Sequence, residues 1–136
     1  MALVSHTTKR GGLSFELTGQ AAHSADAAGT LGYIQNPEDV PIIVKSCYVY
    51  AKTNSTGAAN LTIGHATTVA GAHDTTQLLA ATALAAAAGK AITGFANGDA
   101  ADELIVVPAD SYICAFASAT TVGFTGTAYL DYDKVI

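Results

Sequence analysis

Short runs in which apolar and polar residues alternate constrain the fold of this chain more than any other feature. The clearest run spans residues 122–132. Because successive side chains of a strand point to opposite faces of the sheet, a period of two predicts a strand with one face toward a core. The two alternating sets are Phe124, Gly126, Ala128, Leu130 and Tyr132, and Gly123, Thr125, Thr127, Tyr129 and Asp131.

Several other segments have the alternating, β-branched or aromatic character of strands, and turn residues separate them. We predict a hairpin between the two segments within 41–65 and a second between 112–117 and 122–132. The pattern favours an all-β protein, with residues 13–136 forming one β-sandwich domain of jelly-roll-like or related type. The further strand segments are 13–17, 31–34, 41–53, 60–65, 103–107 and 112–117.

The segment 41–53 carries large side chains on both faces, which predicts a central strand. Strict alternation divides its side chains into two faces. One face would hold Ile43, Cys47, Val49 and Ala51, and the other Val44, Ser46, Tyr48, Tyr50 and Lys52.

The stretch 66–100 leaves two interpretations open. Its Ala-rich run has high helix propensity, Asp74 stands where an N-cap would, and Gly89 stands where a helix would stop. These signals favour one short helix near 75–88. The apolar spacing is poor, however, so a strand with loops is the alternative.

Residues 1–12 show no alternation and end in Gly11 and Gly12. We interpret them as an extended N-terminal arm with a flexible glycine joint. Such an arm would reach across to a neighbouring subunit.

The low charge of the chain indicates which classes of partner it can bind. Only 12% of the 136 residues are charged, the net charge is −5, and six residues are Lys or Arg. A nucleic-acid-binding face needs a basic patch, so no nucleic-acid partner is expected. No apolar run suits a membrane span or a signal peptide, so neither a membrane nor Sec export is expected. A charge-poor surface favours cover by partner subunits over a free surface dressed with Thr, Ser and Gly.

No catalytic constellation is evident: there is no Gly-x-Ser-x-Gly elbow and no Cys in a nucleophile-like context. We therefore expect that the protein is not an enzyme. The two cysteines, Cys47 and Cys114, sit in apolar runs and are expected to be buried thiols, with a disulfide as the alternative.

Metal ligands are not arranged in a known pattern either. The four histidines do not match zinc spacing, and a simple turn explains the densest acidic group better than a Ca²⁺ loop does. No cofactor or metal is expected. The residues considered are His6, His23, His65 and His73, and the acidic Asp99, Asp102 and Glu103.

Six tyrosines and no tryptophan remain to be explained. Tyr48 and Tyr50 share one face of their strand, whereas Tyr129 and Tyr132 fall on opposite faces of theirs. Tyrosine buries a large ring and keeps its hydroxyl near water, so it suits the core and subunit interfaces. A sugar-binding groove is the alternative.

The segment 104–121 followed by 123–132 resembles the closing hairpin of small capsid decoration, or cement, proteins of tailed bacteriophages. The stretches 48–53 and 59–64 are similar in style. The resemblance implies a jelly-roll-like homotrimer, assembled in the host cytoplasm, on the capsid exterior of the virion. There it would clamp adjacent subunits of the major capsid protein.

From this resemblance we expect a structural virion protein; the alternative is a receptor- or carbohydrate-binding head module of a phage tail or fibre. The candidate partner contacts come from the arm and from the last strand. They are Leu3, Val4, Lys9, Arg10, Tyr129 and Tyr132.

Overall fold

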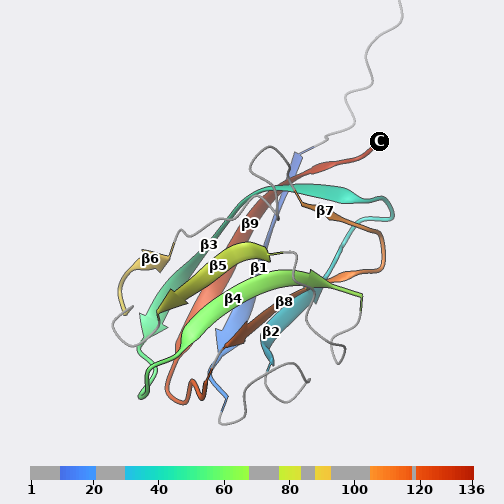
Figure 1. Ribbon diagram of the computed structural model, residues 1–136. Coiled ribbons are helices and arrows are strands. Elements are labelled where there is room, and N and C mark those ends of the chain that lie inside the picture. Colours follow the sequence, from blue (N-terminus) through green and yellow to red (C-terminus); the bar gives the residue numbers. More distant parts are fainter. Residues whose placement is uncertain (1–9, 21–29, 68–76, 84–87, 93–104, 118) are drawn as a thin grey trace, which may run out of the picture.

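The computed structural model describes residues 10–20, 30–67, 77–83, 88–92, 105–117 and 119–136, and within them the chain is all-β (Figure 1). The all-β prediction is therefore confirmed. The strands are β1 Arg10–Thr18, β2 Thr30–Gln35, β3 Ile42–Thr53, β4 Asn60–Ala66, β5 Gln77–Ala83, β6 Ala91–Ile92, β7 Val106–Val107, β8 Tyr112–Ala117 and β9 Thr125–Lys134.

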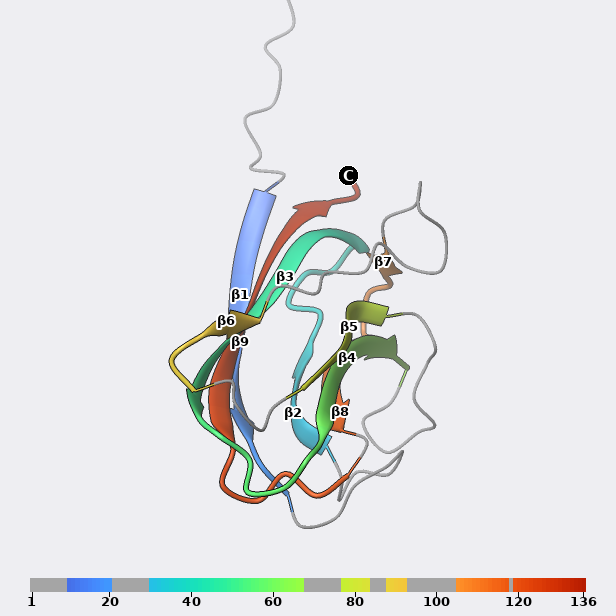
Figure 2. The same ribbon diagram turned by 60° about the vertical axis from the view of Figure 1, so that its left-hand side comes forward.

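The strands form two antiparallel sheets packed face to face, which Figure 2 shows nearly edge-on. Sheet A has the order β1-β9-β3-β6, and β7 also pairs with β3; sheet B has the order β2-β8-β4-β5. The first strand thus lies beside the last, and the second beside the last but one. This is the jelly-roll-like sandwich that the sequence predicts.

Strand β9 lies between β1 and β3 and pairs with both along its length. The predicted alternation holds from Ala128 onward, where Ala128 and Leu130 are buried and Tyr129 and Asp131 are exposed. Thr127, predicted on the outer face, is buried, and its hydroxyl donates to Glu16. Strand β3 has neighbours on both sides, which confirms its central position.

The core fills the space between the sheets. Both sheets contribute fully buried side chains, and no large charged side chain of the described residues is among them. Burial of each such side chain stabilises the fold by about 1.5–3 kcal/mol. The largest are Phe124, Leu17, Ile42, Leu61, Ile63, Leu78 and Ile113.

Both predicted hairpins are wrong, although their strands exist. Strand β3 pairs with β9 in sheet A, whereas β4 pairs with β8 and β5 in sheet B. Likewise β8 and β9 belong to different sheets. Alternation identifies the buried face of a strand but not its neighbour, and in this topology many consecutive strands cross from one sheet to the other.

The helix predicted near 75–88 is also wrong over the part that the structure describes. Residues 77–83 form strand β5, in which Leu79 lies opposite Ile63 of β4 and Leu78 is fully buried. Ala88 and Gly89 form a turn in which Gly89 has φ of 77°. Helix propensities differ by less than about 1 kcal/mol per residue, so pairing and burial in the sheet outweigh them.

The predicted arm is shorter than residues 1–12, because strand β1 already begins at Arg10. Gly11 lies opposite Tyr132, and Gly12 lies opposite Asp131. A Cβ at residue 11 would lie 2.5 Å from the Tyr132 hydroxyl oxygen, so a larger residue there would displace the Tyr132 ring. Gly11 is thus a paired residue of a strand, and it is not a flexible joint. Residues 1–9 lie outside the described part.

A bulge in β3 corrects the predicted faces of that strand. The pairing with β9 shifts between Val44 and Ser46, so the strand changes face there. Val44 therefore joins Cys47 and Val49 in the core, whereas Ile43 is only partly buried. Strict alternation had placed Val44 and Ile43 on the wrong faces.

The edges of the two sheets come into close contact at Gly32 of β2. A Cβ built there would lie 2.3 Å from the backbone oxygen of Glu16 and 3.0 Å from Leu17 Cδ2. We expect Gly32→Ala to lower the free energy of unfolding by about 1–3 kcal/mol, because the backbone of β1 must shift. Gly57→Ala is the matched control, since nothing lies within 4 Å of its Cβ position. Equal urea midpoints for the two variants would contradict this close approach.

Candidate functional site

The outer face of sheet B is closed over its centre. Thr62, Ala66 and Cys114 alternate with core residues and so project away from the core, yet all three are buried. Tyr33, on the edge strand β2, remains 54% exposed and packs edge-to-face on Tyr112 with ring centroids 6.0 Å apart. On the outer face of sheet A, Thr127 is likewise buried, but the three tyrosines around it are each more than a third exposed.

The outer face of sheet A carries three partly exposed tyrosines. Tyr48 is 39% exposed, Tyr50 42% and Tyr129 38%. The register places Tyr129 between Ser14 of β1 and Tyr48 of β3. We call this surface the tyrosine face; its residues are Ser14, Glu16, Tyr48, Tyr50, Tyr129 and Asp131.

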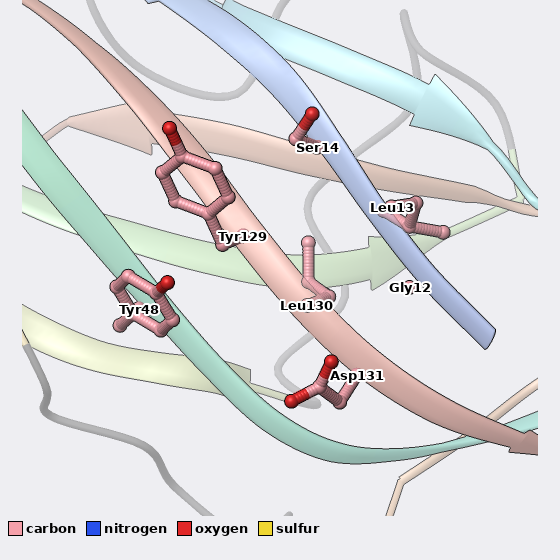
Figure 3. Close-up of a pocket in the computed structure, with 7 residues that line it drawn as sticks. All are labelled: Gly12, Leu13, Ser14, Tyr48, Tyr129, Leu130 and Asp131. Atoms are coloured by element: carbon pink, nitrogen blue, oxygen red, sulfur yellow. The ribbon is translucent and has the colours of Figure 1, made fainter. Parts of the chain in front are cut away.

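Tyr48 and Tyr129 stack on each other, with ring centroids 5.1 Å apart and an angle of 21° between the ring planes. Figure 3 shows them side by side on β3 and β9. Tyr129 stands on β9, which pairs on both sides, and Tyr48 stands on β3, which pairs with β9 at this residue and with β6 at the adjoining Val49 and Tyr50. The two rings therefore form a preorganised aromatic platform.

A shallow depression of about 410 Å³ lies beside this platform. It exists partly because residue 12 has no side chain: a Cβ there would stand in the opening, 3.6 Å from Asp131 Oδ1. The lining offers aromatic rings, hydroxyl groups and one carboxylate, and no Lys or Arg of the described chain belongs to it. We call it the tyrosine depression, lined by Gly12, Leu13, Ser14, Tyr48, Tyr129, Leu130 and Asp131 (Figure 3).

Ion pairs on this side of the molecule leave one carboxylate unmatched. Glu16 lies 3.4 Å from Lys52, and Asp133 lies 3.6 Å from Lys45. Asp131 accepts a hydrogen bond from the Ser46 hydroxyl at 3.2 Å, and no ion pair joins it to a cation within the described ranges. A neighbouring depression of about 350 Å³ is lined by charges of both signs, among them Arg10, Lys45 and Asp133.

Of the six predicted partner contacts, two are exposed, three lie outside the described residues and one is buried. Tyr129 lies on the tyrosine face, and Arg10 is exposed at the start of β1. Leu3, Val4 and Lys9 lie outside the described residues.

The prediction of Tyr132 as a partner contact is wrong, because this residue is only 6% exposed and packs in the core. Its hydroxyl donates to Glu38 at 3.3 Å, and Glu38 lies 3.5 Å from Lys134. Burial, together with the charge and hydrogen bond of Glu38, raises the pKa of Tyr132. The alternation with Leu130 was the signal for this buried position.

Groups that could support catalysis or metal binding are sparse where the structure describes the chain. No group of three His, Cys, Asp or Glu side chains is placed to hold a metal ion there. Both cysteines are free and buried, and burial raises the pKa of Cys47 to about 12 and that of Cys114 to about 11. Such thiols are poor nucleophiles near neutral pH.

Several residues weighed from the sequence lie outside the described part, so the structure does not test them. The described ranges also contain no helix that is long and apolar enough to cross a membrane. The residues outside are His6, His23, His73, Asp99, Asp102 and Glu103.

Comparison with protein-family models, with curated proteins and with solved structures finds no match to this chain.

Buried thiols make stability sensitive to alkaline pH. Because the pKa values of Cys47 and Cys114 are raised in the folded chain, the unfolded chain loses these protons first. The stabilisation is complete below pH 9, and each thiol removes about 1.4 kcal/mol per pH unit as pH rises toward its folded pKa. Tyr132 acts in the same direction at higher pH.

Urea unfolding at pH 8, 9, 10 and 11 measures this fall, and Cys47→Ala should make it less steep, because Cys114 and Tyr132 still contribute. A free energy of unfolding that stays constant over this range would contradict the burial of the thiols.

The stacked tyrosines should be energetically coupled. We expect a double-mutant cycle of Tyr48→Ser and Tyr129→Ser to give a coupling of about 0.5–1 kcal/mol in the free energy of unfolding. Tyr50→Ser with Tyr129→Ser is the control, because Tyr50 lies opposite Thr127 rather than Tyr129. Additive losses at Tyr48 and Tyr129 would show that the rings do not stack in solution.

Proposed function

We propose that this chain is a structural virion protein that binds the outer capsid surface and stabilises contacts between major capsid protein subunits. The observation that carries the proposal is the tyrosine face: three partly exposed tyrosines on a rigid sheet of a charge-poor chain. Aromatic residues are enriched at protein interfaces, where the ring is buried and the hydroxyl keeps a hydrogen bond.

The rigidity of sheet A suits a static contact. Strand β9 pairs with β1 from Thr18 to Arg10 without a register shift, and β3 flanks it on the other side. Such a face loses little conformational entropy on binding. Modest contacts repeated in many copies around a shell sum to a large stabilisation.

The fold agrees with what the resemblance to cement proteins implies, namely a jelly-roll-like sandwich. Under this proposal the chain acts on the capsid exterior as a homotrimer, with the tyrosine face toward the capsid. Residues 1–9, with Leu3, Val4 and Lys9, would then reach a neighbouring subunit.

Co-sedimentation with capsids of the virus that encodes this chain tests the proposal. We expect the purified chain to bind, and the double variant Tyr48→Ser/Tyr129→Ser to bind at least about tenfold more weakly, because central aromatic residues dominate interface energies. Tyr33→Ser is the matched control, since it removes an exposed tyrosine from the other sheet.

The proposal would be contradicted if the wild-type chain did not co-sediment with capsids but bound sugars on a glycan array. That result would favour the receptor- or carbohydrate-binding head module. Equal losses for the double variant and for Tyr33→Ser would remove the tyrosine face as the contact surface.

A further inference from the structure

The tyrosine depression combines an aromatic ring, a carboxylate and open space within one opening of the sheet A surface. We infer that it receives the side chain of an arginine from the protein partner. This inference rests on the proposed function, since it names the chemistry by which the tyrosine face would recognise its partner.

The aromatic platform fits a planar cation. Tyr129 and Tyr48 both line the depression, and because each ring covers one face of the other, a ligand can stack only on an outer face of the pair. A guanidinium group is flat, weakly hydrated and attracted to the face of an aromatic ring. A lysine ammonium is compact and strongly hydrated, so it would gain less from the same platform.

The charge of the lining favours a cation. Asp131 supplies the one carboxylate, and no cationic side chain of the described residues lines the depression. Arg10 and Lys45 line the neighbouring depression, to which Asp131 also belongs, but the ion pair that forms there joins Lys45 to Asp133, at 3.6 Å, and not to Asp131. A guanidinium donating to Asp131 would match the remaining charge.

The opening is large enough for the side chain to enter. Its volume is about 410 Å³, and Gly12 leaves the β1 side free. A Cβ at residue 12 would make only ordinary contacts, at 3.6 Å from Asp131 Oδ1 and from the Leu130 oxygen. A larger residue there would therefore project into the depression beside Asp131 and take up part of its volume.

An NMR titration of the ¹⁵N-labelled full chain with N-acetyl-arginine amide tests the inference without any capsid. We expect saturable shifts of the Gly12, Tyr129 and Asp131 signals, with half-saturation at millimolar concentration, as the ligand efficiency of so small a probe allows. N-acetyl-lysine amide should bind several-fold more weakly.

Three variants make the test specific. Asp131→Asn should weaken arginine binding by about tenfold or more, because it removes a charge-assisted hydrogen bond. Gly12→Val should weaken arginine binding several-fold, because its side chain takes up part of the depression, and the urea midpoint of this variant is the check on its folding. Glu16→Gln is the control: it removes a carboxylate from the same face, but one that Lys52 already pairs, so binding should stay as in the wild-type chain.

Absence of saturable shifts with the arginine probe would overturn the inference, as would equal losses for Asp131→Asn and Glu16→Gln. Methyl glucopyranoside shifting the same signals in place of the arginine probe would overturn it in favour of a sugar site. Because the titration uses no capsid, its failure is distinguishable from failure of capsid binding, which co-sedimentation measures separately.

Discussion

The antiparallel pairing of β9 with both β1 and β3 is the constraint on which the rest of the structure depends. It joins the two ends of the described chain in sheet A and fixes which side chains of the last strand face the core. Phe124 and Leu130 pack inward as a consequence, and Tyr129 points out between Ser14 and Tyr48. A slip of β9 by one residue would turn its buried side chains to the outer face and its outer side chains, Tyr129 among them, toward the core.

Much of the fold could be predicted from the local sequence pattern. The predictions that were wrong concern contacts between segments far apart in the sequence. The strand at 122–132 and the central position of β3 followed from period and side-chain bulk. The hairpins failed because alternation does not say which strand is the neighbour. The helix failed at 77–83 because pairing with β4 outweighs the small helix preference of alanine. The bulge after Val44 could not be predicted, because a strict period of two assumes that no residue is inserted into the strand.

The site was only partly predictable for the same reason. Tyr129 could be assigned to an outward face, and Tyr132 could have been assigned to the core from its alternation with Leu130. The stacking of Tyr48 on Tyr129, and the depression that Gly12 leaves beside them, depend on registers between strands far apart in the sequence. Gly12 had been interpreted as part of a joint, whereas in the sheet its missing side chain shapes the candidate binding surface.

The two outer faces of the sandwich differ in their exposed tyrosines, and the proposed function rests on that difference: sheet A exposes Tyr48, Tyr50 and Tyr129, whereas sheet B exposes Tyr33 at its edge. Hydroxyl-radical footprinting with mass spectrometry, comparing the free chain with the chain on virions, tests it most directly. The account predicts that Tyr48 and Tyr129 become protected on virions, while Tyr33 of sheet B keeps its reactivity. Protection of Tyr33 with unchanged reactivity of Tyr48 and Tyr129 would contradict it.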